Sequence, residues 1–114
     1  MSKIKLEKQI GGTVMHLSGK FIGGEETDEL KSLLNELAEK GEKKLIINLA
    51  DVTYLNSTAL GVLIASHANF TKREGKIVLC NVSKSIENIF VITKLSLVFN
   101  IADNLEEAIN SLSN

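Results

Sequence analysis

The sequence predicts a small α/β fold with a mixed sheet of four to five strands and about four helices. Short apolar runs alternate along the chain with longer amphipathic segments, which is the order of strands joined by helical crossovers. A Gly11-Gly12 pair separates two strand-like segments near the N-terminus and predicts an antiparallel hairpin. With 114 residues, 44% of them hydrophobic, and no proline, the chain is expected to form a single domain over residues 1–114.

The first strands are predicted at residues 3–9 and 13–17, on either side of the glycine pair, because apolar residues recur there. Residues 18–24 are expected to form a flexible loop. Residues 25–40 have acidic residues in the first turn and Gly41 after the last, which indicates a helix. Its core-facing residues have helical spacing. They are Leu30, Leu33, Leu34 and Leu37.

A buried strand is predicted at residues 44–49, followed by a connection over residues 51–55. Asn56, Ser57 and Thr58 are all able to cap a helix, which is expected to run from 57 to about 74 with Gly75 as its C-cap. Further elements are predicted at 76–80 (strand), 83–93 (helix), 97–99 (strand) and 104–112 (helix, with capping-box spacing between Asp103 and Glu106). Right-handed crossovers then give a parallel run of strands with the hairpin at its edge.

The predicted central helix is too apolar for a single buried face. Leu60, Leu63 and Ile64 form one helical stripe, and His67 follows with the same spacing. A second group falls largely outside that stripe: Ala59, Val62, Ser66 and Phe70. Either the last helix or another protein is expected to cover this second side. Gly61 is expected to allow close approach of backbone from the sheet or from a partner.

Composition narrows the function classes. The net charge of -1 gives no reason to expect binding to nucleic acid or to a membrane, and no apolar run is long enough for a membrane span. The single cysteine, Cys80, excludes an internal disulfide and is expected in a buried strand. We expect a cytoplasmic protein that is not an enzyme and needs no metal or cofactor. His16 and His67 are not well placed to serve as a base for Ser57, which also lacks a G-x-S-x-G elbow.

Residues 51–61, DVTYLNSTALG, resemble the phosphorylation loop of the STAS domain, specifically that of stand-alone bacterial anti-sigma factor antagonists. The similarity extends over essentially the whole chain. Residues 17–21 resemble the family's L-x-G-x-hydrophobe segment, and residues 75–79 and 81–83 resemble its next strand and loop. Leu95, Phe99 and residues 103–108 resemble its closing segment. The family usually has Asp before the phosphorylated serine, whereas this chain has Asn56.

The resemblance implies that Ser57 is the phosphorylated residue, with Thr58 as second choice. It implies that the unphosphorylated protein binds an anti-sigma factor that is also a serine kinase, which frees a sigma factor. Phosphorylation would end the association, and a metal-dependent phosphatase of the PP2C type would restore it. The expected partner-binding residues are Gly23, Gly24, Glu25, Asn56, Ser57, Thr58, Ala59 and Val62.

Two other functions stay open on the sequence alone. One is a STAS scaffold or ligand-binding subunit of a lipid-transport or stress-sensing assembly, in which Asn56 would be expected and no kinase would act. The other is a small hydrolase that uses Ser57 as a nucleophile. Incubation with a kinase separates the first from the antagonist, and serine-directed covalent probes test the second.

Overall fold

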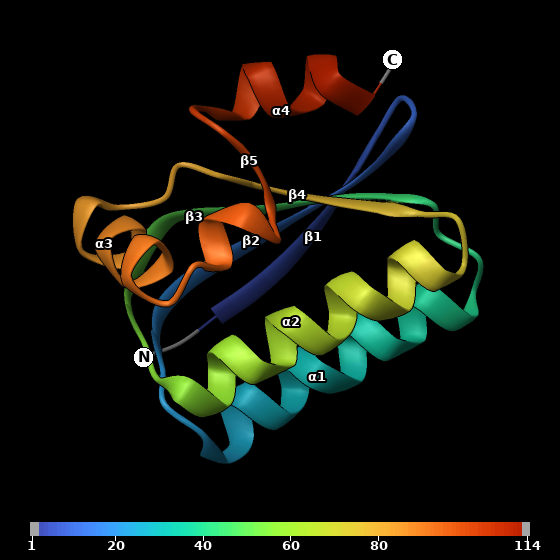
Figure 1. Ribbon diagram of the computed structural model, residues 1–114. Helices are drawn as coiled ribbons and strands as arrows, with labels where there is room; N and C mark the ends of the chain where they lie inside the picture. Colours follow the sequence, from blue (N-terminus) through green and yellow to red (C-terminus); the bar gives the residue numbers. More distant parts are fainter. Residues whose placement is uncertain (1–2, 113–114) are drawn as a thin grey trace.

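The computed structural model describes residues 3–112 as a five-stranded mixed sheet with helices on both faces (Figure 1). The strands lie in the order β1-β2-β3-β4-β5; β1 is antiparallel to β2 and all other neighbours are parallel. The elements are β1 (Lys3–Gln9), β2 (Gly12–Phe21), α1 (Gly24–Glu39), β3 (Lys44–Leu55), α2 (Ser57–Lys72), β4 (Lys76–Cys80), α3 (Lys84–Ile92), the 3-10 helix η1 (Leu95–Leu97), β5 (Asn100–Ala102) and α4 (Leu105–Leu112). The predicted fold class, including the N-terminal hairpin, is confirmed.

Strands β2 and β3 are longer than predicted, and the expected loop at 18–24 and connection at 51–55 are largely strand. Lys20 pairs with Tyr54 and Phe21 with Leu55, so only Ile22 and Gly23 separate β2 from α1. The pairing register shifts between His16 and Ser18 and again beyond Gly19. At each shift β3 contains an extra residue, as in a β-bulge, and this breaks the apolar alternation that would identify a continuous strand.

Asn48 stabilises the first of these bulges. Its Oδ1 accepts hydrogen bonds from the backbone amide of Ala50 at 3.1 Å and from Nδ2 of Asn81 at 2.9 Å. Its Nδ2 lies 3.0 Å from Nδ1 of His16, whose Nε2 lies 2.8 Å from a carboxylate oxygen of Glu7. Because Asn48 uses Nδ2 as a donor, His16 Nδ1 is the acceptor and His16 Nε2 donates to Glu7. One polar chain therefore connects β1, β2, β3 and the end of β4.

Helices α1 and α2 pack side by side on one face of the sheet, and α4 packs on the other (Figure 1). Ala59, Ser66 and Phe70 of α2 are buried, whereas Ile64 is 38% exposed. The buried part of the second apolar side of α2 thus packs within the same chain, beside α1, while Val62 stays partly exposed. The expectation that α4 covers this side is wrong, because α1 lies on the same face of the sheet as α2 and α4 lies on the opposite face.

Three boundaries in the C-terminal half also differ from prediction. Glu74, at φ 65°, ends α2 in the left-handed conformation expected of Gly75. The strand predicted at 97–99 is the 3-10 turn η1 and its exit, and β5 follows it at residues 100–102. Helix α4 is capped by Asn104, whose Oδ1 accepts from the amide of Glu107 at 2.9 Å, and not by Asp103.

Candidate functional site

Ser57 lies where the carboxyl ends of two parallel strands meet the start of a helix. Phe21 and Leu55 are the last paired residues of β2 and β3, and the amide of Asn56 donates to the carbonyl of Phe21 at 3.1 Å. Helix α2 begins at the next residue, and Ser57 is exposed to solvent. The fold therefore presents this serine at the edge of the sheet, the position where α/β folds bind ligands.

Asn56 is the N-cap of α2. Its Oδ1 accepts a hydrogen bond from the amide of Ala59 at 3.0 Å, and its carbonyl accepts from the amide of Leu60 at 2.9 Å. The first turn of α2 contains no acidic residue. The backbone amides of Ser57 and Thr58, which have no carbonyl acceptor within the helix, therefore remain available at the positive end of the helix dipole.

The Gly23-Gly24 segment lies beside this helix start. Figure 1 shows the N-terminal ends of α1 and α2 next to each other, in agreement with the packing of these helices. Gly23 and Gly24 have φ angles of 91° and 77°, which other residues rarely adopt, so the turn requires glycine. The amide of Gly23 donates to Oγ1 of buried Thr27 at 2.9 Å, which fixes the turn against α1. The flexible loop predicted here is a short, hydrogen-bonded turn.

All but one of the predicted partner-binding residues have side chains or backbone that reach the surface. Gly24, Glu25, Ser57 and Thr58 are exposed, and Gly23, Asn56 and Val62 are partly exposed. Ala59 has no exposed surface, so it cannot contact a partner in this structure. Its contribution is the backbone amide that bonds to Asn56.

Two exposed residues near the ends of β2 and β3 were not predicted as site residues. Tyr54 is 49% exposed and Ile22 is 55% exposed, and both line a shallow cavity of about 490 Å3 together with Lys20 and Thr53. The sequence pattern did not reveal Tyr54 because residues 51–55 were assigned to a connection. Read as a strand, they place Leu55 inward and Tyr54 outward.

Gly61 lies on the exposed side of α2, one turn beyond Ser57, where it leaves the helix backbone without a side chain over it. A Cβ built on Gly61 would have no heavy atom of the described residues within 4 Å apart from its own chain neighbours and helix backbone. The predicted close approach of the sheet backbone to this glycine is therefore wrong. Exposed Ile64 lies three residues further along the helix, on the same side.

Neither histidine is linked to Ser57. His16 belongs to the polar chain of Asn48, and His67 packs edge-on against Phe99 with ring centroids 5.7 Å apart. Cys80 is buried, and desolvation raises the pKa of its thiol to about 11, which keeps it protonated and unreactive near neutral pH. Among residues 3–112, no group of three His, Cys, Asp or Glu side chains is arranged to hold a metal ion.

The chain is similar to several known proteins. The anti-sigma-B factor antagonist of Staphylococcus aureus (strain NCTC 8325) is 26% identical over 89 residues, which are 75% of this chain and 82% of that protein. The crystal structure of an anti-sigma factor antagonist from Mycobacterium paratuberculosis matches with a TM-score of 0.87 at 20% identity, covering 100% of this chain and 96% of that one. The Bacillus cell fate determinant SpoIIAA in its phosphorylated form matches with a TM-score of 0.77 at 19% identity, covering 96% and 99%.

No helix within residues 3–112 has the length and apolar character to cross a membrane. The model of the STAS domain family matches residues 3–108, which is nearly the entire chain. The five-stranded mixed sheet with its antiparallel β1–β2 hairpin agrees with this match. The chain therefore belongs to the STAS domain family.

Proposed function

We propose that this protein is an anti-sigma factor antagonist whose binding is controlled by phosphorylation of Ser57. In the unphosphorylated state it binds an anti-sigma factor that is also a serine kinase, and the sigma factor is released. Transfer of a phosphoryl group from ATP to Ser57 ends the association, and a PP2C-type phosphatase reverses it. Support comes from the family of the chain and from the names of its curated relatives.

The observation that carries this proposal is the exposed Ser57 at the first position of α2. A phosphoserine has a charge of about -1.5 to -2 at neutral pH. The helix N-terminus stabilises that charge through free amides and the helix dipole, so the fold is expected to survive the modification. A partner packed against the neutral hydroxyl would instead have to bury an unpaired anion, which costs several kcal/mol and weakens binding about a thousandfold or more.

Asn56 fits this switch despite the aspartate that the family usually has there. The neutral amide caps α2 through Oδ1, as an aspartate would, but it adds no negative charge next to Ser57. With no acidic residue in the first turn of α2, the phosphate has less like-charge repulsion to overcome. We therefore expect Asn56 to favour the phosphorylated state of the folded protein.

Phosphorylation is tested by incubating the protein with the serine kinase encoded nearest to it in the genome and ATP, followed by intact-mass measurement. The expected result is a mass gain of one phosphate that is lost in Ser57→Ala and kept in Thr58→Ala. A phosphate that persists in Ser57→Ala and disappears in Thr58→Ala would move the switch to Thr58. No mass gain in the wild type would refute the kinase step.

Binding is tested separately by titration calorimetry with the same kinase. Ser57→Ala is expected to bind like the unmodified protein, and Ser57→Asp to bind poorly, because its carboxylate places a negative charge where the partner meets a neutral hydroxyl. Ser85→Asp is the matched control, because Ser85 is an exposed serine in the first turn of α3. Equal affinities of Ser57→Asp and Ser57→Ala would refute the proposed switch.

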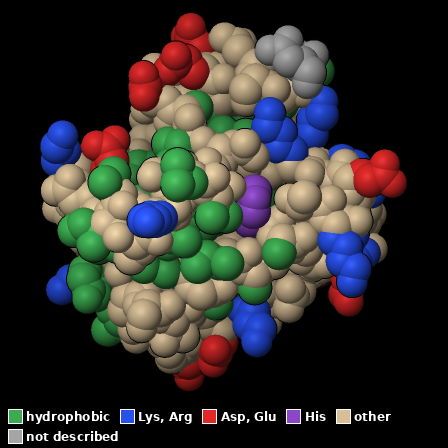
Figure 2. Space-filling view, viewed as in Figure 1, with side chains coloured by type: hydrophobic (Ala, Val, Ile, Leu, Met, Phe, Trp, Pro, Cys, Tyr) green, Lys and Arg blue, Asp and Glu red, His purple; other side chains and the backbone are tan. Residues whose placement is uncertain are grey.

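A second candidate function is a STAS scaffold subunit, which an exposed apolar surface favours. Figure 2 shows hydrophobic side chains gathered over α3 and η1. The exposed hydrophobic residues of α3, η1 and the segment up to β5 are Val91 (60% exposed), Ile92 (80%), Leu97 (82%), Val98 (44%) and Ile101 (40%). Exposed apolar surface of this kind is typical of protein contacts.

The two functions differ in which substitution abolishes assembly. A scaffold is expected to keep its partners in Ser57→Asp and to lose them in Ile92→Ser/Leu97→Ser. An antagonist is expected to show the opposite pattern. Ile10→Ser controls for loss of an exposed isoleucine, because Ile10 is fully exposed at the tip of the hairpin.

A further inference from the structure

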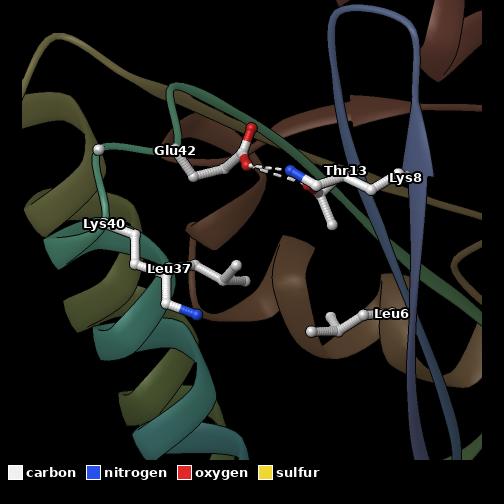
Figure 3. A pocket seen from close by; sticks show the side chains of 7 residues that line it. Leu6, Lys8, Thr13, Leu37, Lys40 and Glu42 are labelled. Atoms are coloured by element: carbon white, nitrogen blue, oxygen red, sulfur yellow. Dashed lines mark hydrogen bonds and ion pairs between the residues drawn. The ribbon is translucent and has the colours of Figure 1, made fainter.

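A second cavity lies at the opposite end of α1 from the Ser57 surface, between the β1–β2 hairpin and the start of β3 (Figure 3). It has a volume of about 380 Å3, which lies within the range of small-molecule sites. It is lined by Leu6, Lys8, Thr13, Leu37, Lys40, Gly41 and Glu42.

Two leucines form the apolar walls of this cavity. Leu6 of β1 and Leu37 of α1 both point into it in Figure 3. Leu6 lies on the same face of β1 as Ile4, two residues earlier, which packs against the core beneath α1 and α2. Leu6 is nevertheless 42% exposed. Because β1 is an edge strand, α1 does not cover its far end, and the apolar surface between Leu6 and Leu37 is left open.

A hydrogen-bonded bridge closes one side of the cavity. Oε2 of Glu42 accepts from Oγ1 of Thr13 at 3.0 Å and from Nζ of Lys8 at 3.3 Å (Figure 3). Thr13 is 2% exposed and the Glu42 side chain 16%, so the hydrogen bond between them is held in place, whereas the Lys8 side chain is 82% exposed. The single carboxylate of the bridge is already paired with a cation, and it therefore offers little attraction to a positively charged ligand.

Lys40 is the cation that a ligand could recruit. Its Nζ pairs at 3.1 Å with Glu36 one turn earlier on α1, and the two side chains are 69% and 56% exposed. Exposed pairs of this kind are weakly held, so Lys40 can exchange Glu36 for another anion at little cost. The lining then holds two cations, Lys8 and Lys40, and one carboxylate, Glu42, above two apolar walls. Glu36 lies outside the lining and is the partner that Lys40 would leave.

We propose that this cavity binds a small amphipathic monoanion, with its anionic group on Lys40 and its apolar body between Leu6 and Leu37. The site is separate from the surface around Ser57, and the proposal does not depend on phosphorylation. Charge and apolar body are both required: a short anion lacks contact with the leucines, and an apolar cation is repelled by Lys40. Hexanoate has the required chemistry and serves as the probe.

The test is a titration of the 15N-labelled protein followed by amide chemical shifts. Hexanoate is expected to give saturable shifts at Leu6, Leu37 and Gly41, whereas acetate and hexylammonium are expected to give none that saturate. Lys40→Met removes the charge and keeps an apolar stem, so it should weaken hexanoate binding about tenfold. Leu6→Gln should weaken it through the apolar wall.

Lys31→Met is the matched control, since Lys31 is an exposed lysine on the same helix outside the cavity, and it should leave hexanoate binding unchanged. Amide spectra of the free variants establish that each is folded. Three results would overturn the proposal: no saturation with hexanoate up to a concentration on the order of 10 mM, equal binding of hexylammonium, or an unchanged affinity in Lys40→Met.

Discussion

The side-chain oxygen of Asn56 accepts a hydrogen bond from the backbone amide of Ala59 at 3.0 Å, and this contact starts helix α2 directly before Ser57. Replacing the cap with Asn56→Ala is expected to lower the free energy of unfolding by about 1 kcal/mol. Asn56→Asp keeps the cap and should be as stable as the wild type or slightly more so. Urea unfolding of the three proteins measures this difference. If Asn56→Ala were as stable as the wild type, the cap would have no role in stability.

Phosphorylation should reverse the order of stability of the wild type and Asn56→Asp. An aspartate next to phosphoserine adds a second negative charge at the same helix end, and like charges in such proximity repel. Phosphorylated Asn56→Asp is therefore expected to be less stable than phosphorylated wild type. Thermal unfolding of both proteins after complete phosphorylation tests this expectation. A larger stability of the phosphorylated variant would contradict the role proposed for Asn56.

Gly61 is expected to make the protein less stable than alanine would, because no contact within the described chain requires a glycine there. A Cβ at this position meets no described neighbour within 4 Å, so Gly61→Ala should raise the free energy of unfolding by about 0.5 to 1 kcal/mol. If a partner packs on this side of α2, the same substitution should weaken its binding. Gly12→Ala provides the opposite case, because its Cβ would lie 2.6 Å from the carbonyl oxygen of Lys44. Destabilisation by Gly61→Ala would contradict the prediction.

Asn48 is expected to be the most sensitive polar residue of the sheet. Asn48→Ala leaves Nδ1 of His16 and Nδ2 of Asn81 without their partners in partly buried positions, and it removes the acceptor of the exposed amide of Ala50. Loss of several such contacts should cost about 2 to 3 kcal/mol in denaturant unfolding. Asn35→Ala, on the exposed side of α1, is the control and should change stability by less than about 0.5 kcal/mol. Similar effects of the two substitutions would show that the polar chain contributes little.

Cys80 should make stability depend on pH above neutrality. Desolvation raises the pKa of the folded thiol from 9.0 to about 11, so the unfolded state loses this proton first as the pH rises. The stabilising contribution is complete below pH 9 and is lost between about pH 9 and 11, with a total of about 2 to 3 kcal/mol. Because lysine and tyrosine side chains ordinarily titrate in the same range, the quantity to measure is the difference in pH slope between wild type and Cys80→Ala. The same dependence of stability on pH in wild type and Cys80→Ala between pH 9 and 11 would contradict a contribution from Cys80.

Much of the fold follows from local sequence patterns, but long-range pairing decides the rest. The glycine turn and the leucines of α1 identify the hairpin and the first helix. The ends of β2 and β3 cannot be read in the same way, because two bulges shift the alternation and the strands continue only by pairing with each other. Residues 97–99 are apolar without being a strand: Leu97 is 82% exposed, and only Phe99 enters the core.

In the candidate site, too, some features follow from the local sequence and others depend on long-range packing. The cap at Asn56 and the exposure of Ser57 follow from a polar cluster placed before an apolar helix. The burial of Ala59 and Phe70 does not, since it depends on where α1 lies relative to α2. Tyr54 was missed for a similar reason: its outward direction depends on the pairing of β3 with β2. The cavity beside Lys40 joins β1, α1 and β3, and no single stretch of sequence reveals it.

The spatial order of the strands is the same as their order along the chain. When a strand leaves the ribosome, the one strand that precedes it in the sheet has therefore already been synthesised. The sheet can grow from β1 towards β5 during translation. Shortening the chain from its C-terminus would remove strands from one edge only, without opening the middle of the sheet.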